Sequence, residues 1–171
     1  MIVFLASDVM LFASFFAAYF LLRSTTETWP PPEVDLDMVR AGAATAVLVA
    51  SSFSLIAGER AYAEDDMRGL RRWLLVTIAL GGVFLTNQLV EYAQLPFGIG
   101  TDVYGSSYWM LTGLHTAHVS VGLCALGLLF VRGARVRHDA EIAPWVSATS
   151  AFWHLVDVVW VFLFVTIWIV R

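Results

Sequence analysis

The chain has 171 residues, of which 59% are hydrophobic and only 14% are charged, and its mean hydropathy is +0.74. A water-soluble domain has roughly 45–50% apolar and about 25% charged residues, so this composition indicates a membrane protein. The net charge of −4 argues against nucleic-acid binding, because no basic patch is large enough. With a single cysteine, Cys124, the chain has no internal disulfide framework.

Five stretches are long and apolar enough to cross a bilayer, which requires about 20 mostly apolar residues. They cover approximately residues 1–22, 39–58, 73–93, 108–131 and 145–170. Backbone polar groups in lipid must be satisfied within the chain, and the alternation of a β-barrel is absent, so helices are predicted. Because the connections are short, residues 1–171 are predicted to form one all-α, polytopic membrane domain.

The first stretch is apolar from Met1 onward and has neither a charged leading region nor a clear cleavage site. Its length of about 22 residues is that of a spanning helix rather than of a signal peptide. A spanning helix usually follows a polar leader, so we expect this leader to be missing or very short.

The arginines predict the orientation of the chain in the membrane. Seven of them lie in the loops 59–72 and 132–144, whereas the opposite side holds Arg23, Arg40 and Arg171. By the positive-inside rule the two arginine-rich loops face the cytoplasm, which places the N-terminus inside and the C-terminus outside. Arginines at such a rim contact lipid phosphates, and the candidates are Arg72, Arg132 and Arg135.

A few polar side chains lie inside the predicted helices, where an ionisable group costs about 2.5–3.5 kcal/mol. They are Asp8 in the first helix, Gln88 and Glu91 in the third, His115 and His118 in the fourth, and His154 and Asp157 in the fifth. Each of the three pairs is spaced i,i+3 and therefore lies on one helix face. These faces are expected to point into the bundle rather than toward lipid.

The residues alone leave several roles open for these side chains. A structural polar core between helices is favoured over a metal site, a haem site or a proton relay through Asp8 or Glu91. The sequence HTAH at residues 115–118 is a weak metal signal, since a third ligand would have to come from Glu91, His154 or Asp157. Haem ligation by histidine pairs usually needs four histidines, and only three lie in predicted helices.

Four segments, in order along the chain, resemble subunit III of the haem–copper terminal oxidases, in its short five-helix bacterial form. The segment FLASDVMLFASFFAAYFLLR resembles the helix with an acid after serine, and NQLVEYAQLPFGIGTDVYGSSYW resembles the Q-x-x-E-Y segment with its Tyr-Gly-Ser loop. TGLHTAHVSVG is similar to the T-G-x-H-x-x-H-V motif, and FWHLVDVVWVFLF to the W-H-x-x-D-x-V-W motif.

The resemblance implies a non-catalytic subunit of a proton-pumping cytochrome c oxidase in the bacterial plasma membrane. Such a subunit holds no cofactor or metal; haem and copper reside in subunits I and II, and subunit I is the main contact. It stabilises the core subunit, binds phospholipids in a cleft and supports proton uptake during dioxygen reduction. Asp8 would be the carboxyl beside that cleft. An interhelical polar core would consist of Gln88, Glu91, His115, His118, His154 and Asp157.

One position departs from the family pattern and keeps alternatives open. Many cytochrome c oxidase members carry Glu where this chain has Asp8, and quinol-oxidase members can carry Asp there. A quinol-oxidase subunit III and the related subunit associated with nitric oxide reductase are therefore the alternatives. A stand-alone membrane metalloprotein and a small transporter with acidic relay residues are more remote.

Overall fold

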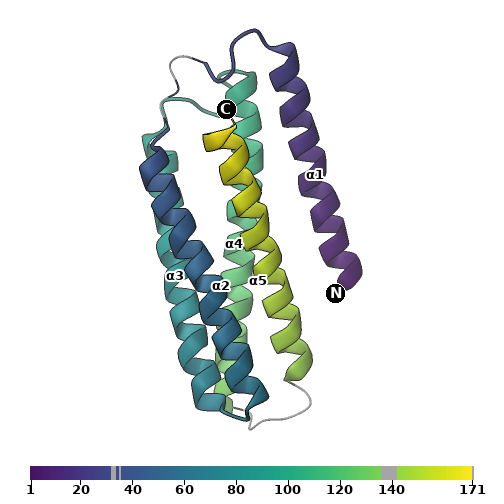
Figure 1. The fold of residues 1–171 in the computed structure, drawn as a ribbon, viewed down its shortest axis with the longest axis vertical. Coiled ribbons are helices and arrows are strands. Elements are labelled where there is room, and N and C mark those ends of the chain that lie inside the picture. Colours follow the sequence, from purple (N-terminus) through teal and green to yellow (C-terminus); the bar gives the residue numbers. More distant parts are fainter. Residues whose placement is uncertain (32–33, 35, 136–141, 171) are drawn as a thin grey trace.

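A computed structural model describes residues 1–31, 34, 36–135 and 142–170, with the side chains of residues 134 and 135 outside the description. It contains five long helices (Figure 1): α1 (Ile2–Thr25), α2 (Met38–Ala63), α3 (Met67–Gln94), α4 (Val103–Arg135) and α5 (Ala143–Phe164), followed by the π-helical turn η1 (Val165–Ile169). All five are long and apolar enough to cross a membrane. The predicted all-α architecture with five candidate membrane spans is confirmed.

Side-chain caps define where α2 and α3 begin. Asp37 accepts hydrogen bonds from the amides of Val39 and Arg40, both at 3.0 Å. Asp66 does the same for Arg68 at 3.1 Å and Gly69 at 2.9 Å. Each cap satisfies amides that have no partner within the helix, which stabilises a helix start by about 1 kcal/mol.

The helices do not contribute equally to the interior. α2 and α3 form a tight hairpin, α4 and α5 pack against it, and α1 lies along one side against α4 and α5 (Figure 1). In the most apolar window of each helix, 56% of α5 is buried but only 17% of α1. α5 is therefore the centre of the bundle, and α1 is its periphery.

Two glycines make room for the most deeply placed tryptophan. A Cβ atom on Gly81 of α3 would lie 2.7 Å from the Trp153 ring, and one on Gly122 of α4 would lie 2.8 Å from it. Trp153 is fully buried between these two backbones. Small residues allow helices to approach closely in a membrane, and here they seat the indole of α5.

Candidate functional site

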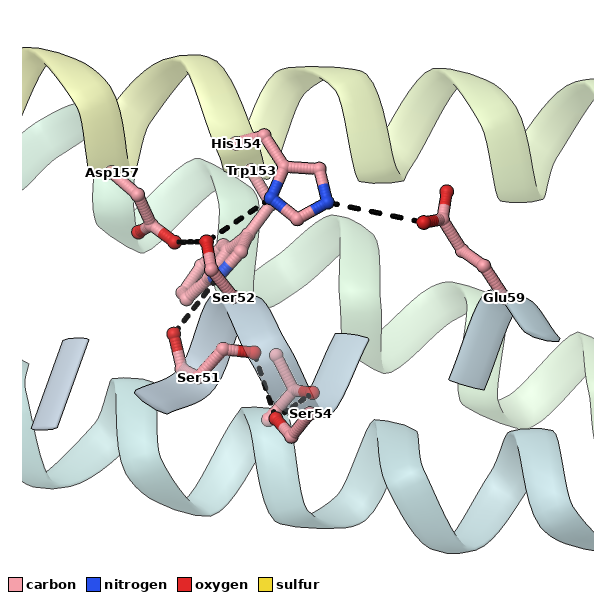
Figure 2. Close-up of polar contacts among 8 residues, drawn as sticks. Ser51, Ser52, Ser54, Glu59, Trp153, His154 and Asp157 are labelled. Atoms are coloured by element: carbon pink, nitrogen blue, oxygen red, sulfur yellow. Dashed lines mark hydrogen bonds and ion pairs between the residues drawn. The ribbon is translucent and has the colours of Figure 1, made fainter. Parts of the chain in front are cut away.

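The face of α5 that carries His154 and Asp157 packs on α2. Figure 2 shows Ser52 of α2 between these two side chains. The Ser52 hydroxyl donates to Asp157 Oδ2 and lies 3.0 Å from Nδ1 of His154. Because this hydroxyl has one proton, its oxygen accepts from the Nδ1–H of His154, and Nε2 is left facing Glu59 Oε2 at 3.9 Å. One serine thus contacts both polar residues of the α5 face, while Oδ1 of Asp157 is buried without a hydrogen-bond partner among the described residues.

Two tryptophans of the same α5 segment also donate to α2. Nε1 of Trp153 donates to Ser51 Oγ at 3.1 Å, and Nε1 of Trp160 donates to Thr45 Oγ1 at 2.9 Å (the first is drawn in Figure 2). These α2 hydroxyls were not among the predicted site residues. Thr45 and Ser52, which both meet side chains of α5, are seven residues apart on one face of α2, and this spacing is the signal that could have identified that face.

Asp8 of α1 faces His118 of α4. Its Oδ1 lies 3.8 Å from Nε2 of His118, whose Nδ1 donates to the Leu114 carbonyl at 2.8 Å. The other carboxyl oxygen, Oδ2, is buried, and no described residue hydrogen-bonds to it. The pair joins the peripheral helix to the bundle and leaves one carboxyl oxygen available.

The two polar residues predicted for the interior of α3, Glu91 and Gln88, differ in their contacts. Tyr108 donates its hydroxyl to Oε1 of Glu91 at 3.3 Å. The side chain of Gln88 is fully buried, and its two polar atoms have no hydrogen-bond partner among the described residues.

His115 is fully buried among aromatic rings. The ring centroid of Trp160 lies 5.0 Å from that of the imidazole, that of Phe84 lies 6.1 Å away, and that of Phe12 lies 6.4 Å away. The structure therefore separates the seven polar residues noted in the sequence into an α2–α5 network, the Asp8–His118 pair, the Glu91–Tyr108 contact, and the buried Gln88 and His115. Within the described ranges, no group of three or more His, Cys, Asp or Glu side chains could hold a metal ion.

An apolar groove runs between α1 and α5, with a volume of about 500 Å³. Its lining includes Phe12, Phe16 and Phe20 of α1 and Leu155, Val159 and Phe162 of α5. Asp8 lies one helical turn before Phe12, and at the other end of α1 the guanidinium of Arg23 donates to the Val170 carbonyl at 2.8 Å.

The three predicted rim arginines have different surroundings. Arg72 lines a cavity of about 240 Å³ together with Arg68 and Arg71. The guanidinium of Arg132 lies 4.0 Å above the Trp145 ring, so it joins α4 to the start of α5. The side chain of Arg135 lies outside the described residues.

The sequence analysis did not identify the role of Arg40. Its guanidinium donates to Asn87 Oδ1 at 2.8 Å, to the Asn87 carbonyl at 3.2 Å and to Gln94 Oε1 at 2.6 Å. Asn87 and Gln94 are spaced i,i+7 on α3, which is the signal that could have paired them with an arginine on a neighbouring helix. Arg40 fastens the end of the α2–α3 hairpin that lies opposite its turn.

Five apolar helices joined by buried polar contacts define a multi-span, all-α membrane protein. A family model described as cytochrome c oxidase subunit III matches residues 1–170. The chain belongs to the cytochrome c oxidase subunit III family, which confirms the resemblance carried by the four motifs. It is therefore a subunit of a cytochrome c oxidase complex, and this membership implies partner oxidase subunits.

Similar proteins from bacteria cover nearly the whole chain. Cytochrome c oxidase subunit 3 of Thermostichus vulcanus is 36% identical over 170 residues, which are 99% of this chain and 85% of the relative. The probable cytochrome c oxidase subunit 3 of Nocardia farcinica is 39% identical over 174 residues, covering 99% and 86%. The Synechocystis sp. protein, cytochrome c oxidase subunit 3, is 33% identical over 170 residues, covering 98% and 73%.

Proposed function

We propose that the chain is the non-catalytic third subunit of a proton-pumping cytochrome c oxidase in a bacterial plasma membrane. Subunit I is its main contact, and subunit II belongs to the same complex. Haem and copper reside in those two partners, where electrons reach dioxygen. The family match over residues 1–170 is the observation that supports this proposal.

The proposed orientation places the N-terminus in the cytoplasm and the C-terminus outside. The N-terminus of α1, the α2–α3 turn and the start of α5 lie toward one end of the bundle, and the C-terminus lies toward the other (Figure 1). Arg60, Arg68, Arg71 and Arg72 flank the α2–α3 turn. Cytoplasmic loops carry an excess of arginine and lysine, so this end is the cytoplasmic one.

The groove between α1 and α5 is the proposed site for the acyl chain of a membrane phospholipid. Its volume of about 500 Å³ is lined almost entirely by apolar side chains of two helices that make few direct contacts. An apolar lining of this kind offers water no hydrogen bonds, whereas a lipid acyl chain makes dispersion contacts with it along its whole length.

Asp8 is the proposed carboxyl that supports proton uptake. It lies about 10 Å along α1 from the helix start, at a rise of about 1.5 Å per residue, and therefore near the cytoplasmic end. Asp8 is buried beside the groove between α1 and α5 and faces His118. One of its carboxyl oxygens has no hydrogen-bond partner among the described residues. A carboxyl with an adjacent imidazole can take up a proton and release it again.

The experiment compares Asp8→Ala with Asp8→Glu in the intact oxidase. Asp8→Ala is expected to leave the haem content unchanged and to reduce several-fold the number of turnovers before inactivation, most strongly at alkaline pH, where protons are scarce. Asp8→Glu should retain the wild-type lifetime because it keeps the carboxyl. Ser7→Ala is the matched control, since Ser7 is exposed and, among the described residues, its hydroxyl donates only to the Phe4 carbonyl. An unchanged turnover profile of Asp8→Ala at alkaline pH would contradict the assignment.

A further inference from the structure

The beginning of α3 gathers three arginines on one face. Arg68, Arg71, Arg72 and Leu75 are spaced i, i+3, i+4 and i+7, and together with Phe130 of α4 they line a cavity of about 240 Å³. We name this cavity the arginine pocket. It lies at the end of the bundle assigned to the cytoplasm and is separate from the groove between α1 and α5.

Arg71 is held in place across the two helices. Its guanidinium carbon lies 5.0 Å from the centroid of the Phe130 ring, a cation–π geometry. Its side-chain stem passes Gly133, where an added Cβ would approach Arg71 Cγ to 3.9 Å. Nε of Arg71 is buried, and no described residue accepts a hydrogen bond from it. A donor is therefore already positioned and desolvated.

The arginines of the pocket lack carboxylate partners within the part of the chain that the structure describes. Among the described residues, none forms an ion pair with Arg68, Arg71 or Arg72. Asp66, two residues before Arg68, uses Oδ1 to cap the first turn of α3. Three guanidinium groups at one place attract an anion, and their planar forks match the geometry of phosphate oxygens.

The apolar side of the pocket indicates which anion it binds. Leu75 is 51% exposed and lies one turn beyond Arg71 and Arg72 toward the middle of the membrane span. A free phosphate ion would gain nothing from Leu75 and Phe130, whereas a lipid would place its phosphate among the arginines and its acyl chain along Leu75.

We propose that the arginine pocket binds the phosphate group of an anionic membrane phospholipid. The proposal deepens the lipid-binding role proposed above and rests on it for the membrane setting, but it concerns a second place on the molecule. It also extends the rim assignment from Arg72 to Arg68 and Arg71, whereas Arg132 lies over the Trp145 ring and does not line this pocket.

The test uses the complete oxidase purified in detergent and titrated with phosphatidylglycerol, with bound lipids counted by native mass spectrometry. Arg68→Gln/Arg71→Gln/Arg72→Gln should bind one phosphatidylglycerol fewer, with an apparent Kd raised about a hundredfold, or about fivefold per arginine. Arg60→Gln is the matched control, because Arg60 is an exposed arginine at the same end but outside the pocket. It should bind phosphatidylglycerol like the wild type.

Three results would overturn the proposal: equal phosphatidylglycerol binding by the triple variant and the control, equal binding of phosphatidylcholine, or displacement of the lipid by excess inorganic phosphate. If the triple variant fails to assemble, Arg72→Gln alone decides, with the expected change about fivefold. A failure of the oxidase-subunit role would instead appear as absence of the wild-type chain from the purified complex, so the two failures are distinguishable.

Discussion

α1 and α5 are both apolar helices that contact α4, yet they are held in different ways. α5 buries ten side chains and places two tryptophans, a histidine and an aspartate against hydroxyls of α2. α1 buries only Asp8, Phe12 and Tyr19. In lipid no hydrophobic driving force brings helices together, so packing and interhelical hydrogen bonds decide how firmly each is held.

The difference indicates a division of roles within one small bundle. The interior around α5 has close backbone approaches and four side-chain hydrogen bonds to α2, which suits a rigid scaffold. The surroundings of α1 have an apolar groove and a carboxyl that meets only the ring of His118 among the described residues, which suits the exchange of lipids or protons proposed above. Three variants test this contrast, beginning with the largest expected effect.

Gly81→Leu should disrupt the packing of α5 and have the largest effect. Even a Cβ at this position would lie 2.7 Å from the Trp153 ring, so a larger side chain forces α3 and α5 apart. Overpacking of this kind costs about 3 kcal/mol, near the upper end of its usual range. We expect little of the subunit to remain in the purified complex, as measured by its stoichiometry and by the thermal midpoint in detergent.

Gly82→Leu is the control for that variant, because a Cβ on Gly82 has nothing within 4 Å. It should assemble like the wild type. Equal losses from the two variants would show that helix α3 does not tolerate leucine here for reasons unrelated to Trp153.

Ser52→Ala should have an intermediate effect. It removes the hydroxyl that donates to Asp157 and accepts from His154, and Asp157 is then left buried without a described hydrogen-bond partner. Leaving such a group unsatisfied costs about 2 kcal/mol. Detergent stability of the complex should fall while its metal content stays constant. Ser147→Ala on the exposed face of α5 is the control, and a normal yield with altered metal content would contradict a structural role.

Trp29→Phe should have the smallest effect and should be confined to α1. The indole of Trp29 donates to the Tyr19 hydroxyl at 3.0 Å, and loss of one such hydrogen bond costs about 1 kcal/mol. Hydrogen exchange of the α1 backbone should accelerate about fivefold while that of α5 is unchanged. Trp73→Phe, at a tryptophan that is 41% exposed, is the control. Equal acceleration in α1 and α5 would show that the two helices open together.

The helices could be predicted because an apolar run of about 20 residues is a local property of the sequence. The residues at which the helices begin could not be predicted in the same way. α3 begins at Met67 rather than near residue 73, since the Asp66 cap allows polar turns to continue the helix beyond the apolar stretch. α4 likewise begins at Val103 rather than near residue 108.

The partners of the polar side chains were beyond prediction for a different reason. The i,i+3 spacing of His154 and Asp157 identifies the face they share but not the helix that meets it. That neighbour depends on how the whole bundle packs, and here it is α2, through Ser52. The aromatic surroundings of His115 similarly come from three other helices.

The hydrogen bond from Arg23 to the Val170 carbonyl makes the groove between α1 and α5 unequal at its two ends. In the proposed orientation this hydrogen bond joins the helices at the outer surface, whereas near Asp8 the described contact between α1 and α5 is the weaker ring pair Phe4–Phe152, with centroids 6.0 Å apart. On the lipid role proposed above, acyl chains are expected to enter and leave the groove from the inner leaflet. The composition of that one leaflet, rather than of the membrane as a whole, determines which lipid lies beside the carboxyl.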